Sequence, residues 1–274
     1  IFVDVNKENF NFDIYKLKKL ITKKTRAVIS TSLFGRSCDL NKLKKLLPKN
    51  IKLIEDGAQN FGSIFGKNSL NIADISCTSF FPSKNLGSFG DGGAIFTNNN
   101  LIYKKIVMLR NHGQQMYSVT STGPGLNSRL GSIQAGILLE KLKVLNKKLD
   151  NQIKLYKKYQ IFFSKLKIVG FPLIRNHPRI KDAVSTFNLI VRNRRKLIKI
   201  FNKKNIPYKI YYPKPLYKQY QLKNKIRLKN TEFLCKSIIS LPFNELNKKR
   251  FNLVKKYLKE IIRSNKKVFF EKKK

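Results

Sequence analysis

Apolar and polar positions along the first half of the chain form short apolar runs separated by amphipathic stretches. Apolar runs of the length of a buried strand occur at residues 1–5, 26–31, 51–54 and 75–81. Between them, apolar residues recur at helical spacing in residues 13–21 and 39–47. Asp13 and Asp39 stand at the start of these stretches and are candidate N-caps. Strands and helices that alternate at such short spacing predict an α/β fold with a mostly parallel sheet and right-handed crossovers.

The second half of the chain carries longer helical patterns. One begins near residue 133 and is predicted to run to about residue 166 with a break, and its early part, residues 135–139, is apolar nearly all round, as in a helix buried between layers or subunits. Further helices are predicted at residues 104–108, 195–202 and 248–264, and strands at 184–191 and 208–212. The pattern changes near residue 168, and we predict two domains, residues 1–150 and residues 151–274.

The large excess of basic residues does not by itself identify the class of protein. Lysine and arginine number 58 against 15 acidic residues, for a formal net charge of +43. A basic nucleic-acid-associated protein is one interpretation. However, lysine is spread along the whole chain, arginine is scarce beside it, and no RRM, KH or zinc-finger pattern occurs. Asn, Ile, Phe and Tyr are also abundant, so codon composition favours a basic surface without a specific nucleic-acid partner.

Cysteine and histidine usage excludes several kinds of site. Cys38, Cys77 and Cys235 are widely spaced and form no C-x-x-C motif, which predicts free buried thiols in a reducing compartment. His112 and His177 are the chain's two histidines, so there is no material for a histidine–cysteine metal cluster and no metal is expected. No apolar run approaches the roughly 18–20 residues that cross a bilayer. These observations predict a cytoplasmic protein.

Two charged residues follow predicted strands and are the first candidates for chemistry. Asp56 ends one predicted strand, and Lys84 lies just beyond the end of another. In an open α/β sheet, loops at the carboxyl ends of strands bind ligands. The pair could form a salt bridge, or it could serve pyridoxal phosphate (PLP), which needs a lysine to form an imine and an acid to keep the pyridine nitrogen protonated. Neither the G-x-G-x-x-G nor the P-loop pattern occurs, which excludes those nucleotide sites.

The order of several motifs resembles one enzyme family. These motifs are EDGAQ at 55–59, SFFPSKNLG at 79–87, GDGGA at 90–94, LRNHG at 109–113, GLNSRL at 125–130 and YYPKPL at 211–216. Together they are similar to the DegT/DnrJ/EryC1/StrS family of PLP-dependent sugar aminotransferases and cover almost the whole chain. The resemblance implies fold type I, with a large PLP-binding domain, N-terminally truncated here, and a small α+β C-terminal domain.

The resemblance also implies roles for four residues of the predicted strand ends. Lys84 would form the imine with PLP and move protons, and Asp56 would pair with the pyridinium nitrogen. Gln59 would lie against the ring or near its phenolic oxygen, and Ser79 would hydrogen-bond to the phosphate. Three alternatives stay open: Lys84 as a surface lysine, Asp56 as a helix N-cap, and Ser79 as an ordinary strand serine.

The resemblance also implies roles for five further residues, and alternatives to these roles stay open. The residue matching Asn127 reaches the phosphate of the neighbouring subunit in this family, which predicts a homodimer with shared active sites. Arg129 would lie near the substrate entrance, where a fork-shaped cation suits a diphosphate or a sugar carboxylate. The alternative is a helix-start asparagine beside a surface arginine. His112 would either face the site or fill a turn, and Tyr211 and Tyr212 would contact the sugar or be buried at a domain edge.

The implied reaction is transfer of an amino group, from glutamate, to a keto carbon of a nucleotide-linked sugar in ping-pong order. The motifs are most similar to enzymes that aminate UDP-linked 3-keto-N-acetylglucosaminuronic acid for surface polysaccharides. Family members have a long segment before the point where this chain begins, and that segment carries part of the cofactor site. A catalytically incomplete fragment of such an enzyme is therefore the second hypothesis.

Overall fold

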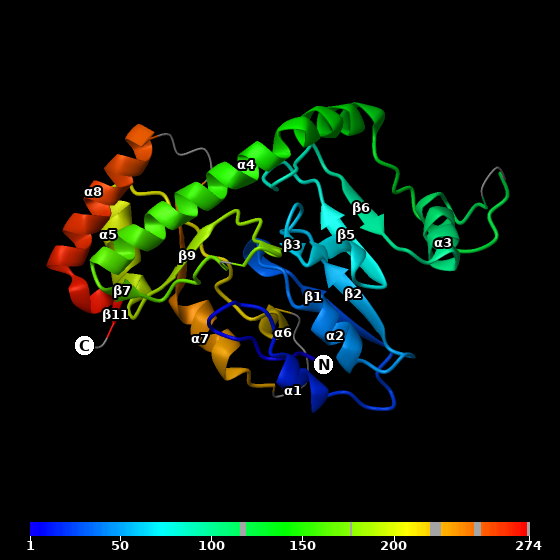
Figure 1. Ribbon diagram of the computed structural model, residues 1–274, viewed down its shortest axis with the longest axis horizontal. Helices are drawn as coiled ribbons and strands as arrows, with labels where there is room; N and C mark the ends of the chain where they lie inside the picture. Colours follow the sequence, from blue (N-terminus) through cyan, green and yellow to red (C-terminus); the bar gives the residue numbers. More distant parts are fainter. Residues whose placement is uncertain (116–118, 176, 220–225, 244–247, 273–274) are drawn as a thin grey trace. The chain divides into compact units, whose positions relative to one another are not determined.

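The computed structural model describes residues 1–115, 119–175, 177–219, 226–243 and 248–272 (Figure 1). It divides into two compact units. The sheet unit comprises Thr22–Leu149 and His177–Ala183, and the second unit comprises Ile1–Ile21, Asp150–Asn176 and Val184–Lys274. The predicted division into a PLP-binding domain of residues 1–150 and a second domain of residues 151–274 concerns function and stays a prediction.

A four-stranded sheet forms the centre of the sheet unit (Figure 1). Its order is β1 (Ala27–Thr31), β2 (Lys52–Asp56), β5 (Ile75–Ser79) and β6 (Gly93–Phe96). The first three strands are parallel, and β6 runs antiparallel to β5. The prediction of a mostly parallel α/β sheet is confirmed, and the carboxyl ends of β1, β2 and β5 therefore share one edge.

Short helices and strands complete the sheet unit. Helix α2 (Leu40–Leu46) starts at the predicted N-cap Asp39, whose side chain accepts a hydrogen bond from the Lys42 amide. The remaining elements are η1 (Leu33–Gly35), β3 (Ile64–Phe65), β4 (Lys67–Asn68), η2 (Ser69–Asn71), α3 (Asn100–Arg110) and β8 (Ile180–Lys181). Strand β3 pairs with β4 and β8, all antiparallel.

Helix α4 (Ser132–Lys165) is one continuous helix, so the predicted break is wrong. No Gly or Pro occurs after Gly136 within it, and nothing interrupts its hydrogen-bond ladder. In the sheet unit its apolar side packs against Phe80 and Leu86 through Leu138, Leu145 and Leu149. Within residues 135–139, Leu138 is buried and Leu139 is 63% exposed. This part of α4 is thus buried on one side of the single chain, not all round as predicted.

The second unit has an aromatic core, in which the rings of Tyr159 and Phe163 both stack on Phe187. Its elements are α1 (Ile14–Lys18), β7 (Ile168–Val169), β9 (Phe187–Ile190), α5 (Arg194–Lys203), α6 (Leu216–Gln219), α7 (Lys229–Ser237), β10 (Ile238–Leu241), α8 (Lys248–Ser264), η3 (Lys266–Val268) and β11 (Phe270–Glu271). The predicted helices at 195–202 and 248–264 are confirmed. The strand predicted at 208–212 is wrong, because Lys209 forms only an isolated bridge with Ser240.

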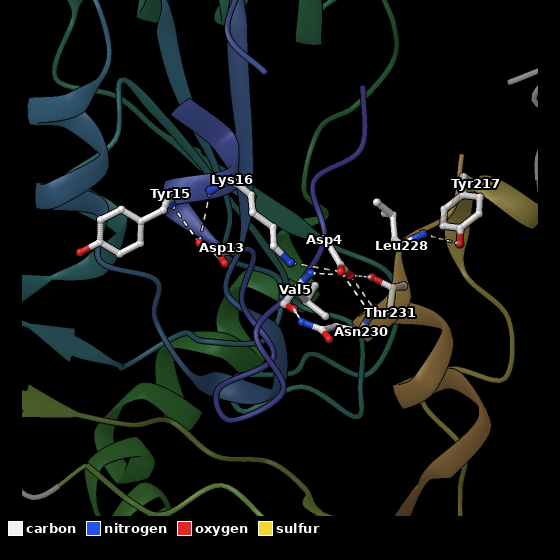
Figure 2. Close-up of polar contacts among 9 residues, drawn as sticks. All are labelled: Asp4, Val5, Asp13, Tyr15, Lys16, Tyr217, Leu228, Asn230 and Thr231. Carbon is white, nitrogen blue, oxygen red and sulfur yellow. Dashed lines mark hydrogen bonds and ion pairs between the residues drawn. The ribbon is translucent and has the colours of Figure 1, made fainter. Parts of the chain in front are cut away.

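Residues 1–5 do not form the predicted strand. The Asp4 carboxylate instead bonds to the start of a helix that is distant in sequence. Val5 forms an isolated bridge with Phe12, whereas Asp4 turns toward the start of α7 (Figure 2). Asp4 accepts hydrogen bonds from the backbone N–H groups of Asn230 at 3.1 Å and Thr231 at 2.9 Å, and from the Thr231 hydroxyl at 2.9 Å. The N-cap residue of α7, Leu228, offers no capping side chain. Asp4 therefore satisfies the free amides of α7 from a distant part of the sequence.

The Asp4 cap predicts acid-sensitive stability. Burial acts to raise the pKa of Asp4, but hydrogen bonds from the amides of Thr231 and Asn230 outweigh it and hold the pKa below its usual value. A carboxyl group with a lowered folded-state pKa stabilises the fold at pH values above its unfolded pKa of about 3.9. This stabilisation is lost as the pH falls through the folded-state pKa. We expect Asp4→Ala to lower the free energy of unfolding at pH 7 by about 1–2 kcal/mol.

Urea denaturation followed by circular dichroism at several pH values measures this effect. The difference from the unaltered chain should shrink as the pH falls from the unfolded pKa through the lower folded-state pKa of Asp4. Glu8→Ala removes an exposed acid from the same segment and should leave the midpoint unchanged. An Asp4→Ala effect that is equal at neutral and acidic pH would contradict the capping role.

Candidate active site

Asp56 and Ser79 end neighbouring parallel strands at the same edge of the sheet. Asp56 is the last residue of β2 and lies beside Cys77 in the register, and Ser79 ends β5 two residues later. Lys84 follows in the loop that leads from β5 to β6. The three side chains are half-buried. The predicted strand-end positions of Asp56 and Lys84 are therefore confirmed.

The Asp56 carboxylate is held by the ends of two strands and a turn. Its Oδ2 lies 3.5 Å from the Thr31 hydroxyl, which donates from the end of β1, and its Oδ1 accepts the Ala58 amide at 3.1 Å. No helix begins here in the part of the chain that the structure describes, so the helix N-cap alternative is wrong. Gly57 permits the tight turn, since a Cβ there would lie 2.6 Å from the Leu70 side chain.

Gln59 joins this turn to the end of β1. Its Oε1 accepts a hydrogen bond from the Phe34 amide at 2.9 Å. Phe34 has a positive φ of 58°, so the backbone of η1 is bent to present this amide. The Gln59 side chain is consequently oriented by the loop that follows β1.

A buried acid beneath Asp56 was not anticipated from the sequence. Glu55 is fully buried and accepts hydrogen bonds from the side chains of Ser32 at 2.9 Å, Asn60 at 2.9 Å and Ser76 at 3.1 Å. Desolvation raises its pKa against these three donors. Alternation along β2 places Glu55 and Asp56 on opposite faces of the sheet. The available signal was an acid at the penultimate position of a buried strand, with one serine directly after β1 and another within β5.

The loop around Lys84 is short and tightly closed. The Lys84 amide donates to the Phe81 carbonyl at 2.9 Å, and the Ser88 amide donates to the Phe80 carbonyl at 2.7 Å. A Cβ on Gly87 would lie 2.6 Å from the Pro82 carbonyl oxygen, so only glycine fits this turn. The loop therefore fixes the backbone from which the Lys84 side chain extends.

His112, Asn127 and Arg129 form a second group, where the chain after α3 folds back on itself. The His112 amide donates to the Leu126 carbonyl at 3.0 Å, and Arg129 Nη1 donates to Asn111 Oδ1 at 2.6 Å. Asn127 pairs with Asn111 and lies five residues before α4, so its alternative role as a helix-start cap is wrong. The side chains of His112, Asn127 and Arg129 are exposed.

Tyr211 and Tyr212 belong to the second unit, with ring centroids 5.5 Å apart. Tyr212 is exposed, so burial at a domain edge does not describe it in this chain. The structure thus brings Asp56, Gln59 and Ser79 to one sheet edge with the Lys84 loop, and gathers the second group at the end of α3. The catalytic and binding roles of all nine residues stay predictions.

The residues at the sheet edge fit PLP by their chemistry. A half-buried carboxylate, hydroxyl and amine at one edge provide an acceptor for a protonated ring nitrogen, a donor for a phosphate and an amine for an aldehyde. No group of three or more His, Cys, Asp and Glu side chains that could hold a metal ion occurs among the described residues.

The cysteines are free, as predicted, although Cys77 is only half-buried. Burial raises the pKa of the Cys38 thiol to about 11, which keeps it protonated and unreactive at neutral pH.

Across the residues that the structure describes, none of the helices has the length and apolar character that a membrane span needs.

Similar proteins of known activity act on nucleotide-linked sugars. The UDP-2-acetamido-2-deoxy-3-oxo-D-glucuronate aminotransferase of Pseudomonas aeruginosa is 34% identical over 247 residues, which are 89% of this chain and 68% of that protein. The dTDP-3-amino-3,6-dideoxy-alpha-D-galactopyranose transaminase of Aneurinibacillus thermoaerophilus is 32% identical over 251 residues, or 89% of this chain and 67% of that protein. Both relatives are sugar aminotransferases by name.

Solved structures confirm the fold. A DegT DnrJ EryC1 StrS aminotransferase from Brucella abortus matches with a TM-score of 0.86 and 27% identity, over 95% of this chain and 73% of that one. NtdA from Bacillus subtilis, solved with bound cofactor PMP, matches with a TM-score of 0.84 and 25% identity, over 96% of this chain and 62% of that one. The predicted fold of a PLP-dependent transferase is therefore confirmed.

A sequence model of the DegT/DnrJ/EryC1/StrS aminotransferase family matches residues 1–258. This match agrees with the motif order, the sheet topology and the position of Lys84 after β5. The chain belongs to the DegT/DnrJ/EryC1/StrS aminotransferase family, whose members are PLP-dependent sugar aminotransferases.

Proposed function

We propose that the chain is a PLP-dependent aminotransferase that moves an amino group from glutamate to the keto carbon of a nucleotide-linked sugar. One observation carries the proposal: the Asp56 carboxylate and the Lys84 loop lie at the carboxyl ends of the adjacent parallel strands β2 and β5. An open α/β sheet binds ligands at this edge. The family membership supports the same conclusion.

Each residue at the sheet edge has a separate task. When bound, PLP supplies the electron-withdrawing ring that stabilises a carbanion. Lys84 provides the amine that attaches the cofactor and then carries a proton, and Asp56 holds the proton of the ring nitrogen. Ser79 donates its hydroxyl to the phosphate. Gln59, fixed by the Phe34 amide, presents its side chain beside the ring.

The sugar we propose is a UDP-linked 3-keto-N-acetylglucosaminuronic acid destined for a surface polysaccharide. The Pseudomonas aeruginosa relative is named for such a substrate. The Arg129 guanidinium would pair with the diphosphate or the sugar carboxylate, and His112, Tyr211 and Tyr212 would contact the sugar. A net charge of +43 would also speed the approach of a nucleotide diphosphate. Three free cysteines agree with the cytoplasm as the place of this reaction.

Chemical trapping followed by a substrate comparison tests the proposal. The chain is incubated with PLP, reduced with borohydride and digested, and mass spectrometry should find the added cofactor on the peptide that contains Lys84. Glutamate and the UDP-linked 3-keto sugar acid should then give the 3-amino sugar, whereas the UDP-linked 3-keto sugar without the carboxylate should react more slowly. Label spread over many lysines with none enriched at Lys84 would contradict the proposal.

We further propose that the enzyme is a homodimer in which Asn127 reaches the phosphate site of the partner. Asn127 and Arg129 lie in an exposed stretch that also presents large apolar side chains. Leu126 is 70% exposed and Ile133 is 79% exposed, which is unusual for neighbours in a monomer. A second copy that covers this stretch would bury these side chains and bring Asn127 to a site that its own subunit does not use.

Mixing two defective variants tests the shared site. Lys84→Ala removes the attaching amine, and Asn127→Ala removes the phosphate contact. A hybrid dimer has one site with both lesions and one intact site, so equal mixing after dissociation should restore about a quarter of the unaltered activity. If Asn127 served its own subunit, every hybrid site would carry one lesion and mixing would restore nothing.

A further inference from the structure

Two lysines of α4 donate to the backbone that directly follows Lys84. Lys148 Nζ donates to the Asn85 carbonyl oxygen at 2.9 Å, and Lys141 Nζ donates to the Gly87 carbonyl oxygen at 2.6 Å. The two lysines are seven residues apart, two helical turns, and so lie on one side of α4. The carbonyls they bind flank Leu86.

The same side of α4 also supplies an apolar anchor for this loop. Leu86 is 2% exposed and packs with Leu138 and Leu145, which are interleaved with the two lysines along α4. The segment after Lys84 is therefore held by one buried side chain and by a charged donor on each side of it. Hydrogen bonds from a charged donor are shorter and stronger than those between neutral groups.

Further contacts hold the residues around these two lysines. Asn85 Nδ2 donates to the Ala183 carbonyl at 2.6 Å, so the residue next to Lys84 is fixed by its side chain as well as by its backbone. The Lys141 ammonium also lies 4.3 Å from the centre of the Phe89 ring. The Phe89 amide donates to Gln134 Oε1, and Gln134 lies two helical turns before Lys141 in α4.

We propose that Lys141 and Lys148 are positioning residues that set the direction of Lys84 toward the cofactor aldehyde by holding the carbonyls of Gly87 and Asn85. This inference rests on the proposed function, because it assumes that Lys84 is the attaching amine. The contacts that define this role are those of the two ammonium groups with the loop carbonyls. They act through the backbone of the Lys84 loop, and small displacements of a reacting group are costly to rate.

The variant Lys141→Met/Lys148→Met removes both donors and keeps apolar side chains of similar length. The measured step joins the Lys84 nitrogen to the aldehyde carbon of PLP as a C=N bond and releases one water. We expect this step to slow by at least about tenfold in the variant. Binding of pyridoxamine phosphate, which has no aldehyde, should change less than about twofold. Lys147→Met, an exposed lysine of the same helix, is the matched control and should react at the unaltered rate.

Hydrogen exchange of the chain without cofactor gives a second readout. The amides of Lys84 and Ser88 close the loop, and their exchange should accelerate in the double variant while that of the sheet does not. Lys141→Arg/Lys148→Arg keeps both donors and should restore both rates. If the double variant does not fold, Lys141→Met alone is compared in the same way, with exchange at Ser88 as the readout.

The outcomes separate the two proposals. Equal attachment rates in the double variant and in Lys147→Met would overturn the positioning role while leaving Lys84 as the attaching amine. Uniformly faster exchange across the whole sheet unit would also overturn it, because the lysines would then only stabilise the fold. Failure of the unaltered chain to attach PLP at Lys84 would instead contradict the proposed function.

Discussion

Lys84→Arg is expected to abolish attachment of PLP and to lower amino transfer by about 10³-fold or more, the scale of loss seen when an essential nucleophile is removed. Arginine keeps a long cationic side chain, but a guanidinium does not lose its proton in proteins and cannot add to an aldehyde. The loop should remain folded, because its contacts come from the backbone of Lys84 and from neighbouring residues. Borohydride trapping and single-turnover kinetics measure the loss.

Lys147→Arg makes the same chemical change at an exposed position of α4 and should keep full activity. Thermal unfolding of both variants separates chemistry from stability, since neither change should move the midpoint by more than a degree or two. Amino transfer by Lys84→Arg within about tenfold of the unaltered rate would show that another amine attaches the cofactor.

Asp56→Asn carries the second-largest expected effect. Asparagine has the same shape and can still accept the Ala58 amide and bond with the Thr31 hydroxyl, so the turn should persist. The substitution removes the negative charge that favours a protonated ring nitrogen. Loss of one partner of a partly buried charge pair costs about 2–5 kcal/mol, which corresponds to a fall in kcat of about 30-fold to about 5000-fold. Attachment of PLP at Lys84 should persist.

Asp74→Asn is a matched control at the opposite edge of the same two strands. Asp74 precedes β5, and its Oδ2 accepts the Leu53 amide at 2.8 Å, so it is a structural acid remote from the carboxyl ends. Its substitution should leave kcat within about twofold of the unaltered value, with at most a small loss of stability. Equal losses of kcat in Asp56→Asn and Asp74→Asn would place the effect of Asp56 in the fold and not in the chemistry.

The local apolar pattern was enough to predict those elements whose buried face packs against segments nearby in the sequence. The strands β1, β2 and β5 and the helix α8 follow their apolar periodicity closely. The N-terminal residues broke the pattern because the partner of Asp4 lies 227 positions away, at Thr231. The aromatic run before Pro213 has strong strand propensity, but prolines at 207 and 213 bracket it and only Lys209 finds a bridge.

The sequence predicted those residues of the candidate site that lie within its recognisable motifs. Asp56 and Lys84 were found because each follows a recognisable strand. Lys141 and Lys148 were not, because nothing in the sequence separates them from the rest of the 58 basic residues. Their role depends on the helical phase of α4 against a loop 54 and 63 positions earlier. Such phase is a property of packing and is not encoded in local composition.

The remote cap on α7 has a consequence for biosynthesis. On the ribosome, the strands of the central sheet emerge as a nearly continuous stretch and can pair early. The carboxylate of Asp4 must wait for 227 further residues before its amide partner is made. At translation rates of about 5–20 residues per second, that interval is roughly 10–45 s. Until then the Asp4 carboxylate has the nearby Val5 amide and Lys16 ammonium as partners, and a release that occurs before α7 is made would leave Asp4 without the helix amides that it caps.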